Sequence, residues 1–233
     1  MKVEKHHTGQ EALRSLTARL IDLMQVKTER RFNLALSGGE TAKQMYALWT
    51  EEYREAINWG RLHFYWVDER CVAPDSPDSN YGHANSLLFE PLNIAPNHIH
   101  RIQGENNPEE EAIRYAAEVN GLVAERNGQP HFDCIILGVG GDLHTASIFP
   151  HTMPLLTDSR SYATAAHPES GQIRVTMTGP VILNDTPLLV PVIGKGKASV
   201  IEALENPDFE KNPTPAVYVL SKATDAILYT ENI

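Results

Sequence analysis

The segment FDCIILGVGGDLHTASIFP, residues 132–150, constrains what this chain can fold into more than any other part of it. Its apolar run from Phe132 to Leu137 is typical of a buried strand. The glycine-rich turn that follows lets the backbone bend tightly and approach a ligand closely. This turn carries Asp142 and His144, which we expect at the start of a following helix. An imidazole changes charge near neutral pH and a carboxylate can orient it, so the pair is a candidate acid–base site.

Two other interpretations of this turn are open. It could be a purely structural turn between a strand and a helix, with Asp142 as the helix cap and His144 without a role. It also fits part of the dinucleotide pattern G-x-G-x-x-G at Gly138 and Gly140. However, Leu143 occupies the position of the third glycine, so the pattern gives little support to a dinucleotide site.

Composition limits the classes of protein to consider. With 233 residues the chain can bury a sizeable core, and we expect one domain over residues 1–233. A formal charge of −10 disfavours nucleic acid or an anionic membrane as partner, and no apolar run has the length of a membrane span. Two cysteines without a C-x-x-C pattern favour a reducing cytoplasm. We expect a monomer or a weak dimer.

Hydrophobic spacing predicts strands and helices in alternation. Helices are predicted over 10–26, 42–49 and 197–204, and another begins after Asn107, whose side chain is a typical helix cap. Predicted strands cover residues 32–36, 63–67, 132–137, 162–166, 174–178, 188–193, 216–220 and 226–230, with a short candidate at 98–102. This order predicts an α/β fold with a mainly parallel sheet covered on both faces. Ligands bind such sheets at the carboxyl ends of the strands, where the candidate motifs lie.

A serine–glycine turn after the strand at 32–36 is a second candidate site. Ser37, Gly38, Gly39 and Thr41 lie between that strand and a helix. Backbone N–H groups, hydroxyls and a helix N-terminus at one place suit a phosphate, although a capped turn without a ligand is the alternative. It is not a Walker loop because no Gly-Lys-Ser/Thr follows, and no serine of the chain fits G-x-S-x-G.

Charged residues follow or begin several predicted strands and helices. Asp68 and Arg70 end an aromatic strand, where Arg70 can bind a phosphate or carboxylate through two N–H groups. Arg174 begins another strand, and Lys195 and Lys197 begin a helix. Each could be a solvated surface charge, but four cations near one turn favour a phosphorylated small molecule. No metal pattern is present, because H-E-x-x-H is absent and no Cys/His cluster has ligand spacing.

Five motifs occur in a characteristic order: S-G-G-x-T, D-E-R followed by D-S-N-Y, L-G-x-G-x-D-x-H-T-A-S-x-F-P, R-x-T-x-T and G-x-x-K-A. Over residues 32–204 the chain thereby resembles the 6-phosphogluconolactonase family, which shares a superfamily with glucosamine-6-phosphate deaminase. The resemblance implies a Rossmann-like three-layer fold of the glucosamine-6-phosphate deaminase, ribose-5-phosphate isomerase and CoA-transferase-like group, with no metal and no redox cofactor. It implies hydrolysis of 6-phospho-D-glucono-1,5-lactone to 6-phosphogluconate, in the oxidative branch of the pentose phosphate pathway.

The resemblance also implies roles for individual residues. His144 is the implied catalytic base that activates water, with Asp142 beside it. The implied ligands of the phosphate and the rest of the substrate are Ser37, Gly38, Gly39, Thr41, Asp68, Arg70, Arg174 and Lys197. The chain departs from the family at Leu143 and His151, where glycine is usual.

Two functions of other classes stay open. An isomerase or deaminase on the same fold needs a second acid–base group, and its segment resembles D-G-H-I-A-F-N-E-P. Here Thr145, Ser147 and Ile148 supply no equivalent glutamate. The other is a non-catalytic sugar-phosphate-sensing domain of a transcription regulator. About 30 residues precede the first predicted strand, which we expect to be too few for a DNA-binding helix pair.

Overall fold

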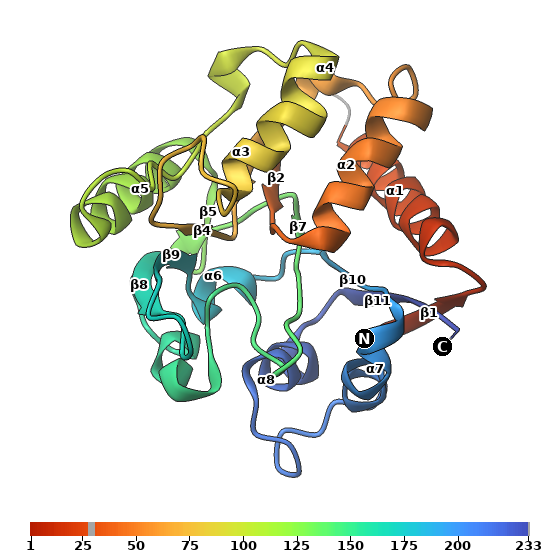
Figure 1. Ribbon diagram of the computed structural model, residues 1–233, viewed down its shortest axis with the longest axis vertical. Coiled ribbons are helices and arrows are strands. Elements are labelled where there is room, and N and C mark those ends of the chain that lie inside the picture. Colours follow the sequence, from red (N-terminus) through yellow and green to blue (C-terminus); the bar gives the residue numbers. More distant parts are fainter. Residues whose placement is uncertain (28–30, 233) are drawn as a thin grey trace.

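A six-stranded parallel sheet forms the centre of the molecule (Figure 1). The structure, a computed structural model, describes residues 1–27 and 31–232. In spatial order the strands are β1 (Lys2–His6), β11 (Ala226–Glu231), β10 (Leu188–Val192), β7 (Cys134–Ile136), β2 (Phe32–Leu36) and β3 (Leu62–Trp66). Neighbouring strands are parallel throughout, which confirms the predicted fold class.

The inner strands are apolar because they are covered on both faces. Every residue of β2, β7 and β10 is buried, as expected for the middle of a parallel sheet. Strand β1 lies at one edge, pairs with β11 and contains a single apolar residue, Val3, among polar and charged ones. The sequence analysis missed β1 because it contains no apolar run.

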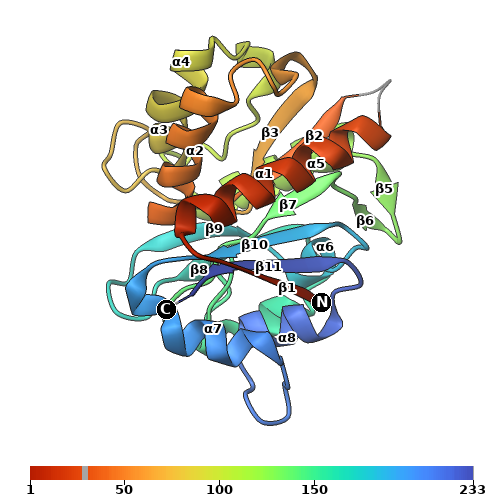
Figure 2. The ribbon, with the colours of Figure 1, turned by 90° about the vertical axis from the view of Figure 1, so that its right-hand side faces the viewer.

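Helices pack on both faces of this sheet. In α1 (Gly9–Val26) the apolar positions Leu13, Leu16 and Leu20 form a buried face, as their spacing predicts. Helix α1 packs against β11 on one side, and α7 (Ala198–Glu205) packs on the other (Figure 2). The remaining helices are α2 (Glu40–Glu52), α3 (Asn80–Ala84), α4 (Glu90–Leu92), α5 (Pro108–Leu122), α6 (Gly179–Ile182) and α8 (Pro215–Lys222), with a π-helical turn at Asn85–Phe89 between α3 and α4.

A separate three-stranded antiparallel sheet adjoins the central one. It consists of β4 (Asp68–Arg70), β9 (Ile173–Met177) and β8 (Tyr162–Ala166), and α5 packs against β8 and β9. The two predicted strands at 162–166 and 174–178 therefore exist but belong to this sheet. Arg174 consequently reaches the site from an antiparallel strand, not from the end of a parallel one as we expected. Two further strands of two residues each, β5 (Glu125–Arg126) and β6 (Gln129–Pro130), pair with each other as an antiparallel hairpin.

Two strand predictions are wrong. Residues 216–220 lie in helix α8, which begins with Pro215 at its first turn and buries Ala216, Val217, Val219 and Leu220. Burial of one helical face overrides the strand propensity of these branched residues. Residues 98–102 form no strand either, because His98 ends a 3₁₀ turn and Ile99 makes an isolated bridge to Phe64.

The helix expected directly after Asp142 and His144 is also absent. Leu143 and Ala146 have φ angles of 62° and 52°, and a right-handed helix cannot contain that conformation. The chain instead forms a compact loop through residues 138–149, and a 3₁₀ turn follows at Pro150–Leu156. Among the described helices, none is long and apolar enough to cross a membrane.

Candidate active site

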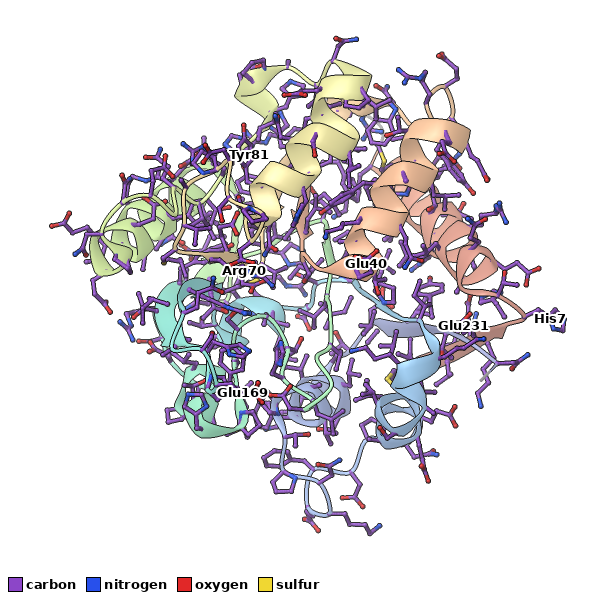
Figure 3. All side chains as sticks on the ribbon, viewed as in Figure 1. His7, Glu40, Arg70, Tyr81, Glu169 and Glu231 are labelled. Carbon is purple, nitrogen blue, oxygen red and sulfur yellow. The ribbon has the colours of Figure 1, made fainter. Side chains whose placement is uncertain are left out.

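A cavity of about 350 Å³ lies where β2, β7 and β10 end. All predicted site residues line it except Asp142, which contacts His144 instead. Arg70, from β4, and Glu40, at the start of α2, both line this cavity and are labelled in Figure 3. The predicted residues on the wall are Ser37, Gly38, Gly39, Thr41, Asp68, Arg70, His144, Arg174 and Lys197. Lys195 is not among the lining residues.

His144 and Asp142 form a close pair. The Nδ1 atom of His144 lies 2.5 Å from Oδ1 of Asp142, which also accepts the backbone N–H of His144 at 3.2 Å. Burial alone raises the pKa of the Asp142 carboxyl, but the charge and hydrogen bonds of His144 outweigh it and lower that pKa below its usual value. Asp142 is therefore ionised and can only accept a hydrogen bond. Because Nδ1 must then carry the proton, neutral His144 has its free lone pair on Nε2.

The loop that carries His144 is fixed by backbone contacts. The N–H of Gly140 donates to the carbonyl of His144 at 2.9 Å, and Thr145 Oγ1 donates to the carbonyl of Gly138 at 2.9 Å. A Cβ atom on Gly140 would lie 2.1 Å from Cε1 of His144, so only glycine leaves room for the ring. Helix α8 holds the loop from outside, because the N–H of Ala216 donates to the carbonyl of Leu143 at 2.9 Å.

The serine–glycine turn leads into α2 as predicted. Ser37 Oγ accepts the N–H of Gly138 at 3.0 Å, which joins this turn to the histidine loop. Gly39 has a φ angle of 91°, which glycine adopts readily and other residues do not. Gly39, the N-cap residue of the 13-residue helix α2, has no side chain that could cap its N-terminus. Its first N–H groups and the helix dipole therefore favour an anion at this end of the cavity.

A buried glutamate holds the neighbouring wall. Glu69 is 2% exposed and accepts the backbone N–H groups of Asn80 at 2.8 Å and Tyr81 at 2.7 Å. Burial raises the pKa of its carboxyl, although these hydrogen bonds oppose the change. Asn80 in turn donates from Nδ2 to the carbonyl of Asp68 at 2.9 Å and packs against Gly38, where a Cβ would lie 1.8 Å from its Oδ1. The segment D-E-R is thus not a solvated strand end.

Asp68, Ser147 and Arg174 form a buried cluster on the same wall. Ser147 Oγ donates to Asp68 Oδ2 at 2.6 Å and accepts from Arg174 Nη1 at 3.3 Å. The guanidinium of Arg174 lies over the ring of Phe149, 5.6 Å from its centroid. The same ring packs against His144 with a centroid distance of 4.8 Å. One aromatic side chain therefore sets the positions of the imidazole and the guanidinium.

The other cationic side chains at the cavity, those of Lys197 and Arg70, make different contacts. Lys197 lines it and donates from Nζ to the carbonyl of Val139 at 3.0 Å. Arg70 donates from Nη1 to the carbonyl of Asp78 at 2.8 Å. The Nε atoms of Arg70 and Arg174 are buried and make no hydrogen bond within the described residues. Across residues 1–27 and 31–232, no cluster of three or more His, Cys, Asp or Glu side chains is arranged to hold a metal ion.

The sequence analysis missed Glu69, Asn80 and Ser147 as parts of the site. All three lie inside motifs that it singled out. Their roles depend on contacts between separate segments of the chain, and no local spacing shows such contacts.

The parallel sheet, the N-terminus of α2 and the histidine–aspartate pair belong to an α/β protein whose cavity suits an anionic small molecule. Residues 5–228 match the family model of glucosamine-6-phosphate isomerases and 6-phosphogluconolactonases. The 6-phosphogluconolactonase of Treponema pallidum is 39% identical over 202 residues, 86% of this chain and 83% of that protein. That of Haemophilus influenzae is 41% identical over 191 residues, covering 82% and 80%. The crystal structure of devB protein superposes with a TM-score of 0.90 at 39% identity, covering 99% and 96%. The chain belongs to this family.

Proposed function

We propose that this protein is a 6-phosphogluconolactonase, which hydrolyses 6-phospho-D-glucono-1,5-lactone to 6-phosphogluconate. The observation that carries the proposal is the His144–Asp142 pair in the same cavity as the free N-terminus of α2. The pair supplies a base and the helix supplies a site for phosphate. Relatives that bear this name cover most of the chain.

The base acts on water. Nε2 of His144 removes a proton from a water molecule as its oxygen attacks C1 of the lactone. The tetrahedral intermediate then breaks the bond between C1 and the ring oxygen, and the imidazolium returns the proton to that oxygen. Asp142 holds the ring and balances the positive charge that forms on it. Acid–base catalysis of this kind accelerates a reaction by about 10²–10⁴-fold.

The phosphate binds at the part of the cavity wall that the serine–glycine turn forms. Ser37, Gly38, Gly39 and Thr41 surround the start of α2, and Lys197 lies close enough to line the same space. Arg70 and Arg174 supply further positive charge, which offsets the overall charge of −10 for an anionic substrate. Contacts to the phosphate place the reacting carbonyl next to His144 and use binding energy remote from the reaction centre.

The rival enzyme of the same fold lacks its second acid–base group here. Thr145 and Ser147 are buried, and their hydroxyls bond to Gly138 and Asp68. Ile148 belongs to the hydrophobic core. None of these side chains can open a sugar ring by proton transfer. The sensing-domain alternative does not explain the close His144–Asp142 pair, because binding alone needs no oriented base.

We also propose that residues 1–233 form one catalytic domain, active as a monomer or weak dimer in the cytoplasm without a metal or redox cofactor. A single hydrophobic cluster that includes residues of β2, β7, β10 and α1 supports one domain. Both cysteines are free, and Cys134 is buried, which agrees with a reducing compartment.

A pH-stat assay on freshly prepared lactone tests the proposal. We expect proton release well above the spontaneous rate, and a much higher kcat/KM for the phosphorylated lactone than for gluconolactone. Equal kcat/KM for both lactones contradicts the phosphate site. Release of ammonia from glucosamine 6-phosphate, with no lactone hydrolysis, supports the deaminase instead. Binding of sugar phosphates without turnover of either substrate supports a sensing role.

A further inference from the structure

Ser147 lies between a buried carboxylate and a buried guanidinium. Its hydroxyl donates to Asp68 Oδ2 at 2.6 Å and accepts from Arg174 Nη1 at 3.3 Å, while Nη1 and Oδ2 themselves are 3.8 Å apart. The side chain of Asp68 is 7% exposed and that of Arg174 is 9% exposed, and Ser147 is fully buried. A carboxylate and a guanidinium this well shielded attract each other strongly. The serine hydroxyl bridges the two groups from the side, and at 3.8 Å the ion pair between them is longer than a direct hydrogen bond.

The backbone fixes Ser147 in this position. Its N–H donates to Oγ1 of Thr176 at 2.9 Å, and Thr176 is the residue of β9 that pairs with Asp68 in β4. Arg174 lies two residues earlier on the same strand. One contact therefore anchors the serine to the two strands that carry the charges, and the spacing of all three groups is built into the antiparallel sheet.

Arg174 has hydrogen-bonding capacity that no described residue uses. Its Nε is buried without a partner in the part of the chain that the structure describes, although the side chain lines the cavity. Burial lowers the pKa of this guanidinium, and the attraction of Asp68 does not offset the loss of solvent. A buried cation with an unused donor is costly unless a ligand completes its contacts.

We propose that Ser147 is a positioning residue that satisfies the Asp68 carboxylate, so that Arg174 remains available to bind the anionic substrate. Without the hydroxyl, the Asp68 carboxylate loses its donor and draws the guanidinium from 3.8 Å into direct hydrogen-bond contact, away from the cavity. The inference rests on the proposed function for the identity of the substrate, but the spacing of the three side chains stands independently of it.

The test is a series of variants with 6-phosphogluconate as the probe, measured by calorimetry. We expect Ser147→Ala to weaken binding by about tenfold or more, as for the loss of one charge-assisted contact. Adding Asp68→Asn to that variant removes the charge that pulls Arg174, and we expect the double variant to bind the probe more tightly than Ser147→Ala. Asp68→Asn alone measures what Asp68 itself contributes to binding. In the lactone assay, Ser147→Ala raises KM and changes kcat little. A packing defect alone lowers thermal stability and is not repaired by the second substitution.

Ser147→Cys is the matched variant if alanine at this position prevents folding. A thiol has nearly the same shape but is a weak donor, so we expect the same loss of affinity without a cavity. The inference is overturned if Ser147→Ala and Ser147→Cys bind the probe within about twofold of wild type, or if the double variant binds no tighter than Ser147→Ala. The proposed function is decided separately, since it fails when wild type binds the probe but does not hydrolyse the lactone.

Discussion

Nδ1 of His144 and Oδ1 of Asp142 lie 2.5 Å apart, on residues separated by a single leucine. Two side chains so close in sequence meet only because the backbone between them turns back, and Leu143 makes that turn with a φ angle of 62°. The contact fixes the proton on Nδ1 and leaves the lone pair of the neutral ring on Nε2. The orientation of the imidazole towards its carboxylate partner is thus set within three consecutive residues.

We predict that His144→Ala lowers kcat by about 10²–10⁴-fold, because the reaction loses its base. The phosphate contacts survive, so the variant still binds 6-phosphogluconate, and calorimetry provides that control.

Asp142→Asn lowers kcat less than His144→Ala does, since the amide changes the orientation and tautomer of the ring without removing it. Wild-type kcat in His144→Ala rules out this base and makes His151, which stacks on Phe149, the next candidate.

Alanine substitutions at the adjacent residues Gly140 and Gly141 provide a matched pair of variants that tests the position of His144. A Cβ on Gly140 would lie 2.1 Å from Cε1 of His144, whereas a Cβ on Gly141 would meet nothing within 4 Å. We expect Gly140→Ala to displace the imidazole and to lower kcat by about tenfold or more, since small misplacements of catalytic groups are costly. Gly141→Ala keeps kcat within about twofold. Steady-state kinetics of both variants, at equal thermal stability, decides this prediction, and equal rates contradict it.

The positive φ angle of Leu143 predicts an unusual order of stabilities. A leucine in this region is strained by about 1–2 kcal/mol, which glycine does not suffer. Leu143→Ala keeps the strain and loses side-chain packing, whereas Leu143→Gly loses the packing but relieves the strain. We therefore expect Leu143→Gly to be the more stable of the two variants by about 1 kcal/mol in urea unfolding. The opposite order means that the strain is absent.

The sequence predicted those elements whose own pattern decides their structure. The leucine spacing of α1 and the apolar runs of β2 and β10 reflect burial of one helix face or both strand faces, and these predictions are confirmed. Helix α8 was predicted as a strand because its valines favour strands locally, while Pro215 and burial of one face favour a helix. Strand β1 exists through pairing with β11, which no local pattern shows.

The residues of the candidate site also fall into those that local sequence patterns indicated and those that only the folded structure shows. His144, Asp142 and the Ser37–Gly39 turn were found because each chemical group lies next to its partner in sequence. Glu69 and Ser147 were missed because their partners are 11 and 79 positions away and meet them only in the folded sheet. Motif patterns thus indicate the candidate catalytic groups, and the three-dimensional structure shows which residues hold them in place.

His63 predicts a loss of stability in mild acid. Burial, together with the charges of Arg31, His98 and His100, lowers its pKa to about 4, while an unfolded histidine titrates near 6.5. Between these values the unfolded chain binds a proton that the folded chain does not, so folding stability from this group is complete above pH 6.5 and falls as the pH drops towards 4. We expect His63→Gln to reduce the loss of urea stability between pH 7 and pH 5. His7→Gln, at an exposed position, leaves it unchanged.

Comparing variants of two lysines near the start of α7 distinguishes a contact to the phosphate from a charge on the surface. Lys197 lines the cavity and Lys195 does not, although both belong to the same 3₁₀ turn. Loss of a charge-assisted contact to the phosphate costs about 1.5–3 kcal/mol, so we expect Lys197→Ala to raise KM by about ten- to hundredfold. Thermal stability stays near wild type because the Nζ contact to the Val139 carbonyl is one partly exposed hydrogen bond. Lys195→Ala serves as the control and keeps KM within about twofold. If the two variants exchange these effects, the phosphate contact belongs to Lys195, and α7 must rotate towards the cavity when the substrate binds.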